Sequence, residues 1–419
     1  MSFCIEEMSK QGSGHRIESI DAGRGIAILL MLFVNDIAGV DGLPSWMKHK
    51  PQGMDGMTFV DLVFPAFLFL VGMSLPFAVK RRLERGDRLG EVWKHILIRT
   101  LGLLVIGIFM VNSDSISDKG HLNPLLWTLL MYAGVLIVWN NPPKSRESAH
   151  DMMKRLRYAG ILLLGALALL YQGNGASGIF QMRLHWWGIL GLIGWAYLVS
   201  CLIYIPLRRQ MAGLVGAMAI LFCIYFADAG GFLIFLDWLK PYLKVSYMLG
   251  SHSAVVLSGA ILGMMLTPDS PVKGHKERMG WAALFGLGLA LAGLLLHSLH
   301  EIHVMFTINK NLGTPPWCLL SSAIFAWIWA LLYWLIDVRG WKRWALPLKS
   351  AGTNALFAFI LAPIFYTLFE LLGKLFGGMN FYAELGNSFS TGLLRAIIFA
   401  SLMTWMTGFL RRAGVWLKL

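Results

Sequence analysis

Charged residues are scarce in this sequence. Asp, Glu, Lys and Arg make up only 14% of the 419 residues, whereas hydrophobic residues make up 57%. Soluble globular domains carry about 25% charged residues, so the composition excludes an ordinary water-soluble fold. Apolar stretches of about 18 residues or more, long enough to span a hydrocarbon core of roughly 30 Å, recur along the whole chain. The sequence therefore predicts an all-α, polytopic transmembrane bundle of about 10–12 helices.

Cysteine is scarce as well. The four cysteines are Cys4, Cys201, Cys223 and Cys318, and no two of them have CxxC spacing. Three lie in apolar runs, where cysteine behaves as a small hydrophobic residue. Neither a disulfide framework nor a zinc knuckle is therefore predicted. The sequence also lacks a strand-borne GxGxxG, a P-loop and a GxSxG motif. These absences exclude the common nucleotide-binding folds and the serine-hydrolase elbow.

Apolar runs predict where the helices lie. We expect helices near 22–40, 58–79, 94–112, 122–139, 155–172, 186–206, 211–228, 250–267, 279–299, 317–337, 350–373 and 391–412. Segment 231–245, interrupted by Pro241, is expected to be interfacial or re-entrant. Gly259 and Gly263 form a GxxxG motif, which is typical of close packing between membrane helices. Because no long polar segment interrupts the series, residues 1–419 are predicted to form a single transmembrane domain.

The net charge of +13 is distributed unevenly. Lys and Arg gather in alternate loops, at 80–88, 142–157, 207–209, 272–278 and 338–343, and again at the end of the chain. This alternation is the positive-inside pattern of membrane proteins. It predicts that these loops and both termini are cytoplasmic and that loop 41–57 faces outward. We expect a multi-pass protein of the cell (inner) membrane, in contact with membrane lipid and not with nucleic acid.

Ionisable groups beside the predicted helices each have two readings. Charged side chains are costly within a membrane and mark functional sites by default. Asp21 and Arg24 lie one turn apart and can form a local ion pair. Thr58 and Asp61 have the spacing of a helix N-cap, where a carboxylate also interacts favourably with the helix dipole. His49, in the outward loop, is either an ordinary loop histidine or an acid, base or nucleophile.

The stretch HSLHEIH (297–303) raises the question of a metal site. The HExxH motif of zinc helices needs its second histidine one full turn after the first, and the spacing here is HExH. His297, His300 and Glu301 can nevertheless share one helical face. An outward polar cluster explains them equally, and no metal site is predicted.

Three blocks of sequence resemble a known family. RIESIDAGRGIAILLMLFVND (16–36), KH (48–49) and GMTFVDLVFPAFLFLVGMS (56–74) are similar to the heparan-alpha-glucosaminide N-acetyltransferase family of transmembrane acetyltransferases. INKNL (308–312), LIDVRGW (335–341) and the pair Gly352 and Asn354 follow in the family's order. The resemblance is strong over 16–80 and looser over 305–360.

The resemblance implies an activity and its residues. Members of the family take acetyl from acetyl-CoA on the cytoplasmic side and deliver it to an amino sugar on the other side. The histidine of the Lys-His pair is the family's active-site residue, which corresponds to His49. The asparagine closing the first core helix corresponds to Asn35, which can donate a hydrogen bond to the thioester oxygen. Asp61 could orient the imidazole. General-base catalysis and an acyl-imidazole intermediate both remain open for His49.

Further residues are expected to contact substrates. Lys310 and Asn311 are placed for the acceptor or the pantetheine arm, and Arg24 for the phosphates of CoA. The implied partners are acetyl-CoA, the co-substrate, and an amino sugar or oligosaccharide acceptor, and a homodimer is compatible with such a bundle. Outward tryptophans offer faces for a sugar ring: Trp186, Trp187, Trp238 and Trp317.

The chain also departs from the better-known animal members of the family. We expect it to lack their large lumenal amino-terminal domain; its middle (140–250) diverges, and helix 350–373 has no histidine where they have one. The catalytic block (16–80) and the C-terminal helices (305–419) keep the resemblance. The identity of the acceptor is therefore undecided. Three alternative functions also stay open: O-acetylation of a periplasmic glycan, glycan transport by a non-enzymatic protein, and a scaffold role.

Overall fold

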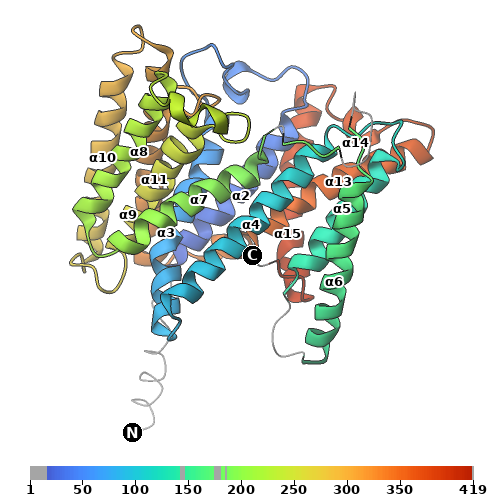
Figure 1. Cartoon of the computed structure of the whole chain (residues 1–419), viewed down its shortest axis with the longest axis horizontal. Helices are drawn as coiled ribbons and strands as arrows, with labels where there is room; N and C mark the ends of the chain where they lie inside the picture. The colour runs from blue at the N-terminus through green and yellow to red at the C-terminus, as the bar shows by residue number, and fades with distance from the viewer. Residues whose placement is uncertain (1–16, 142–146, 174–180, 185, 418–419) are drawn as a thin grey trace.

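The computed structural model describes residues 17–141, 147–173, 181–184 and 186–417, and this part of the chain is all-α (Figure 1). Among the described residues, nine helical segments are long and apolar enough to cross a membrane: α3 (Phe59–Glu84), α4 (Leu89–Ser113), α7 (Gly188–Leu207), α8 (Met211–Ala229), Val245–Met265, α10 (His275–His297), Pro315–Val338, α13 (Ala355–Leu375) and α15 (Phe389–Arg412). The chain is therefore a multi-pass membrane protein, as the sequence predicts.

Other helices complete the bundle. The long ones are α2 (Glu18–Ile37), α5 (Pro124–Trp139) and α6 (Glu147–Leu169). The short ones are η1 (Ser45–Met47), η2 (Ile234–Leu239), η4 (Val304–Phe306), η6 (Arg343–Ala345), α12 (Leu346–Thr353) and α14 (Phe381–Glu384). Two segments are π-helical and continuous with longer helices: η3 (Val245–Ser251) leads into α9 (His252–Met265), and η5 (Trp334–Val338) ends α11 (Pro315–Tyr333).

One expectation about the helices needs correction. The predicted helix 350–373 is two helices, because Asn354 leaves the helical conformation between α12 and α13. Its side chain bonds the end of the chain instead, donating to the carbonyl of Val415 at 3.2 Å and accepting from the N–H of Leu417 at 3.1 Å. Segment 231–245, expected to be interfacial or re-entrant, contains the short helix η2, which has no buried residue.

The connecting loops gather on two opposite faces of the bundle. We call one the His49 face; it comprises residues 38–58, 114–123, 170–173, 186–187, 230–244, 298–314 and 376–388. Backbone hydrogen bonds join these loops to one another: Gly56 N–H donates to the carbonyl of Ile308 at 2.9 Å, and Asp41 N–H to that of Gly386 at 2.8 Å. In Figure 1 the loop between α2 and α3 lies at the top of the view.

The opposite face carries the other helix ends. Lys80, near the end of α3, is paired with Asp269 after α9 at 2.5 Å. The N–H of Glu18, where α2 begins, donates to the Asp337 carboxylate at 3.0 Å. Since Leu417 bonds Asn354 at the start of α13, both ends of the described chain lie on this face.

Helices α3 and α9 pack closely through glycines. A Cβ atom added to Gly72 would lie 1.8 Å from the carbonyl oxygen of Val256, and one added to Gly259 would lie 2.0 Å from that of Phe69. Only glycine allows backbones this near, which bears out the close packing predicted from the GxxxG motif. The contact holds the two helices side by side near the His49 face, with Phe64 of α3 against His252, the first residue of α9.

Candidate functional site

The loop that precedes α3 is anchored at both ends. Val40, Leu43 and Met47 are buried in one small cluster with Ile37, the last residue of α2. The backbone is extended at Lys48 and again at Thr58, where α3 begins, and it turns between them, where the N–H of Met54 donates to the carbonyl of Pro51 at 3.1 Å. His49 is therefore held at the mouth of the bundle by apolar contacts that immediately precede it.

Asp61 caps α3. Its Oδ2 atom accepts the N–H of Thr58 at 3.0 Å and the N–H of Lys50 at 3.3 Å. The Thr58 hydroxyl donates to the carbonyl of Lys48 at 2.9 Å, which joins the loop to the cap. These bonds satisfy donors that would otherwise lack partners at a helix start. Asp61 is only 1% exposed, so its carboxylate is held rigidly.

The second oxygen of Asp61 binds His49. Asp61 Oδ1 lies 2.7 Å from His49 Nδ1. Because an ionised carboxylate only accepts hydrogen bonds, Nδ1 carries the proton in this contact, and Nε2 of the neutral ring keeps a lone pair. The His49 side chain is 42% exposed. A buried carboxylate that orients an accessible imidazole is the arrangement that serves proton transfer in many hydrolases and transferases.

Lys310 reaches the same imidazole from the loop between α10 and α11. Its Nζ lies 3.1 Å from Nδ1 and 3.3 Å from Nε2 of His49. Burial lowers the pKa of the Lys310 ammonium below its ordinary value, although the Asp61 carboxylate opposes the shift. Lys310 therefore gives up its proton more readily than an exposed lysine, within reach of the imidazole.

Asn309 ties the two loops of the site together. Its amide donates to the carbonyls of Gln52 at 2.9 Å and Met54 at 3.0 Å, and its carbonyl accepts the N–H of Leu312 at 3.1 Å. Asn311 donates to the carbonyl of Lys50 at 3.2 Å. The amide of Asn311, expected to contact a substrate, is thus engaged in holding the His49 loop. Sequence reasoning missed Asn309, which is buried and precedes Lys310 directly.

A second histidine–carboxylate pair pins the loop to α10. His297 Nε2 lies 2.7 Å from Asp55, whose other oxygen accepts the N–H of Ile308 at 2.7 Å. Burial alone would raise the pKa of Asp55, but the hydrogen bonds from His297 and Ile308 hold it below its ordinary value. The rings of His297 and His300 stack at 4.8 Å. Among the described residues no three potential ligands are close enough together to hold a metal ion.

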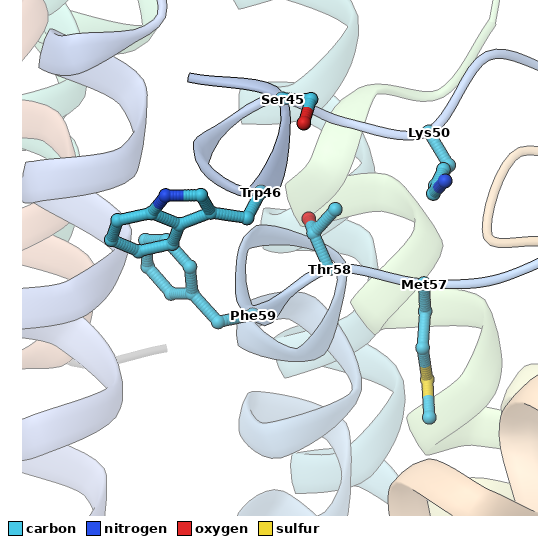
Figure 2. A pocket seen from close by; sticks show the side chains of 6 residues that line it. All are labelled: Ser45, Trp46, Lys50, Met57, Thr58 and Phe59. Carbon is cyan, nitrogen blue, oxygen red and sulfur yellow. The ribbon is translucent and has the colours of Figure 1, made fainter. Parts of the chain in front are cut away.

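A cavity of about 390 Å³ opens beside the His49–Asp61 pair (Figure 2). It is lined by Ser45, Trp46, Lys50, Met57, Thr58 and Phe59. Figure 2 shows the Trp46 indole beside the Phe59 ring, with Lys50 and Met57 on the other side. Trp46 is 60% exposed, with its ring centroid 5.7 Å from that of Phe59. The cavity thus offers the aromatic face of Trp46 and two polar side chains. These are Lys50, which follows His49 in the sequence, and Thr58, the N-cap residue of α3.

The tryptophans expected to face a sugar are placed differently. Trp317 is 0% exposed, so the expectation that it offers an outward face is wrong: it lies in the first turn of α11, inside the bundle. Trp186 and Trp238 are exposed, and Trp187 donates to the carbonyl of Tyr242. His185, also in an outward loop of the sequence, lies outside the described residues.

Asn35 and Arg24 lie outside the hydrogen-bonded site. Asn35 is exposed in the last turn of α2 and takes part in none of the hydrogen bonds that hold His49 among the described residues. Arg24 lies toward the opposite face, bonded to Asp21 as the spacing predicts. Eleven residues of helix, about 16 Å, separate the two side chains along α2.

Next to Asn35 is a polar cluster that sequence reasoning missed. Asp36, in α2, accepts from Arg395 of α15 at 3.1 Å and from the hydroxyl of Tyr382 at 2.5 Å. Arg395 also lies over the Tyr382 ring, 4.7 Å from its centroid. A buried carboxylate needs such partners. A single aspartate near the end of an apolar helix, such as Asp36, therefore predicts a cationic partner, but the sequence does not identify which residue it is.

Fold and site together define a class: a multi-pass membrane protein with an oriented imidazole at one face. Comparison with known proteins identifies the family within this class. The sequence profile of the family described as "Domain of unknown function (DUF5009)" matches residues 16–266, more than half of the chain, and the chain belongs to that family.

Two relatives bear the name heparan-alpha-glucosaminide N-acetyltransferase. The mouse protein is 32% identical over 136 residues, which cover 32% of this chain and 19% of the relative. The human protein is 36% identical over 121 residues, which cover 29% of this chain and 17% of the relative. The resemblance predicted from the sequence is confirmed as distant homology, and it spans less than a fifth of the length of these relatives.

Proposed function

We propose that this protein is an acetyl-CoA-dependent membrane acetyltransferase whose acceptor is an amino sugar or a glycan ending in one. The observation that supports this most directly is the His49–Asp61 pair, with a 2.7 Å contact between Nδ1 and a buried carboxylate. The partial homology to transmembrane N-acetyltransferases supplies the substrate class.

His49 acts through Nε2 in this proposal. Its lone pair takes the proton of the acceptor's amine as the nitrogen attacks the acetyl carbon. The new C–N bond forms, the C–S bond breaks, and the imidazolium returns the proton to the departing sulfur. Asp61 stabilises the imidazolium in between, because its Oδ1 already accepts the Nδ1 proton. An acyl-imidazole route would use the same lone pair of Nε2.

Lys310 and Asn35 supply hydrogen bonds to negative charge. The Lys310 ammonium lies 3.3 Å from Nε2, where the reacting groups meet, and can donate to the oxygen or sulfur that becomes negative. Asn35 is exposed on the same face, so its amide is free of the loop contacts that occupy Asn311. Arg24 serves the phosphates of CoA at the opposite end of α2.

The acceptor binds in the cavity of Figure 2 in this proposal. An exposed indole such as that of Trp46 packs against the apolar face of a sugar ring, and the hydroxyls of Ser45 and Thr58 can bond its edge. Lys50 would disfavour a charged ammonium on the acceptor and favour the neutral amine, which is the nucleophile.

Charge distribution supports the sidedness. Lys80, Arg208, Arg209, Lys273, Arg339 and Arg411 belong to the ends and loops of the opposite face. By the positive-inside rule we infer that this face is cytoplasmic, with the described ends of the chain inside and His49 on the periplasmic side of an inner membrane. Polyanionic CoA then stays inside, and only the acetyl-bearing arm needs to reach His49.

Release of free CoA tests the proposal. Purified protein in nanodiscs, supplied with acetyl-CoA and glucosamine or an oligosaccharide ending in it, should release CoA thiol and yield an acetylated sugar. His49→Ala should lower this rate by about 10²–10⁴-fold while acetyl-CoA still binds. A variant that retains more than a tenth of the wild-type rate would remove His49 from the mechanism.

The acceptor class and the reaction are separate outcomes of this assay. Acetylation of a sugar hydroxyl in place of the amine would make the protein an O-acetyltransferase, with the same role for His49. Turnover with a different periplasmic acceptor, and not with amino sugars, would rule out the amino sugar as the acceptor and leave the acetyltransferase assignment in place. Absence of acetyl-CoA binding and of turnover with every acceptor would favour glycan transport instead.

A further inference from the structure

A second imidazole lies inside the bundle beneath the site. His252 is the first residue of α9 and is only 3% exposed. Among the described residues neither of its ring nitrogens has a hydrogen-bond partner. Aromatic rings surround it, with centroids at 5.2 Å (Phe64), 5.3 Å (Tyr247) and 6.2 Å (Trp317). Burying a polar group without a partner is costly, and such groups are rare in native proteins.

His252 lies about one helical turn deeper than His49. Phe64, which contacts His252, follows Asp61 by three residues in α3, and Asp61 contacts His49. Three residues of α-helix rise about 4.5 Å. Both imidazoles are therefore held along one edge of α3, with the exposed one at the face and the other toward the interior.

One tight turn separates the two imidazoles. The N–H of Gly313 donates to the carbonyl of Lys310 at 3.0 Å. Lys310 contacts His49 at the start of this turn, and Gly313 covers His252 at its end: a Cβ atom on Gly313 would lie 3.2 Å from His252 Nε2. A ligand atom that bonds Nε2 would therefore lie beside the turn that carries Lys310.

Two more unpartnered polar atoms continue inward from His252. The indole nitrogen of Trp317 and the hydroxyl of Ser321 are buried and lack partners among the described residues. They are four residues apart and so lie on the same side of α11, about 6 Å apart along its axis. The neighbouring Ser258 and Ser322 hydroxyls, by contrast, bond each other between α9 and α11 at 3.1 Å.

We propose that His252, Trp317 and Ser321 bind the acyl-thioester arm of acetyl-CoA, an inference that rests on the proposed function. Their N–H and O–H groups are buried donors without partners among the described residues, which suits neutral carbonyl acceptors. The arm presents three of these, the thioester carbonyl and two amide carbonyls. The row of donors leads from the interior toward His49, where the acetyl group is needed.

A pair of CoA derivatives tests this site. S-ethyl-CoA replaces the thioester carbonyl of acetyl-CoA by a methylene group and keeps the rest of the molecule. Because a buried donor left unpaired costs about as much as a strong hydrogen bond, the purified full-length protein should bind acetyl-CoA about tenfold more tightly than S-ethyl-CoA. Calorimetry or competition binding gives both dissociation constants.

His252→Phe should abolish the preference. Phenylalanine fits among the surrounding rings and removes the unpartnered nitrogens, so the thermal midpoint without ligand should stay equal or rise. The ratio of the two dissociation constants should fall to within about twofold of one. His252→Gln, which keeps an N–H donor, should recover part of the ratio, and Trp317→Phe should lower it independently. Tyr247→Phe is the matched control, because Tyr247 contacts the same imidazole ring, and it should leave the ratio unchanged.

The outcomes separate this inference from the proposed function. If wild type turns over acetyl-CoA but the ratio is one, or is unchanged in both His252→Phe and Trp317→Phe, the inference is wrong and the acetyltransferase assignment stands. A lower thermal midpoint with an unchanged ratio would make His252 a packing residue only. If wild type binds neither derivative, the proposed function fails, and this site fails with it.

Discussion

Asp61 performs two tasks with its two carboxylate oxygens. Oδ2 accepts the backbone N–H groups of Thr58 and Lys50, and Oδ1 accepts from His49. The two readings of Asp61 in the sequence, helix cap and imidazole partner, are thus compatible. Because the cap fixes the carboxylate, the imidazole it holds is fixed as well.

Asp61→Asn should impair transfer without unfolding the protein. The amide oxygen can keep the backbone bonds, which turns the NH₂ group toward His49 Nδ1. Nδ1 must then accept, the ring proton moves to Nε2, and the lone pair needed for proton transfer is lost. We expect a fall of about 10²–10⁴-fold in acetyl transfer at an unchanged thermal midpoint. Asp41→Asn, on the exposed part of the same loop, is the control. More than a tenth of wild-type activity in Asp61→Asn would contradict the assignment.

Individual residues differ in how far sequence indicates their place. His49, Asp61 and Lys310 stand in recognisable motifs, and the structure brings their side chains together. Asn309 and His252 give no such signal, because Asn309 binds a loop more than 200 residues earlier and one of the rings around His252, Phe64, lies more than 180 residues earlier. Only the fold shows that one amide joins two loops and that one histidine is buried among rings.

At the scale of elements, apolar runs locate the helices but not their interruptions. Run 350–373 is predominantly apolar, yet the helix is interrupted at Asn354, whose amide binds residues 415 and 417. The π-helical start of the segment Val245–Met265 is likewise invisible in composition. Hydropathy measures what surrounds a helix, whereas these interruptions depend on individual side-chain hydrogen bonds.

The Asp55–His297 pair predicts a pH-dependent contribution to stability. Since the pKa of Asp55 is held below its ordinary value, the pair's contribution is fully present above about pH 4 and is lost as the pH falls through the lowered pKa. Asp55→Asn should therefore lower stability at pH 5–6 by about 1 kcal/mol or less, as is usual for partly exposed pairs. The difference from wild type should shrink below about pH 4.

Thermal unfolding at a series of pH values measures this difference. Asp118→Asn, an exposed carboxylate on the same face, controls for the loss of one charge. A gap between wild type and Asp55→Asn that widens toward acid pH would show that the pair does not stabilise the loop through the ionised carboxylate.

At the scale of the whole molecule, the two faces differ in chemistry. The His49 face gathers the docked loops with their histidines, and the opposite face gathers most of the arginines and lysines. Helix α3 has 26 residues, about 39 Å of helix, which is enough to cross a hydrocarbon core of roughly 30 Å. Its two ends therefore lie in different aqueous compartments, with Asp61 at one and Arg81 and Arg82 at the other.

Labelling with an impermeant thiol reagent decides which compartment holds His49. In a chain whose native cysteines are replaced, Gln52→Cys reports on the His49 face and Arg85→Cys on the opposite face, since both positions are exposed. The positive-inside rule predicts that intact cells label at 52 alone and that 85 reacts only after permeabilisation. Labelling at 85 but not at 52 would place the imidazole in the cytoplasm. His49 and acetyl-CoA would then share one compartment, and no acyl arm would need to pass through the bundle.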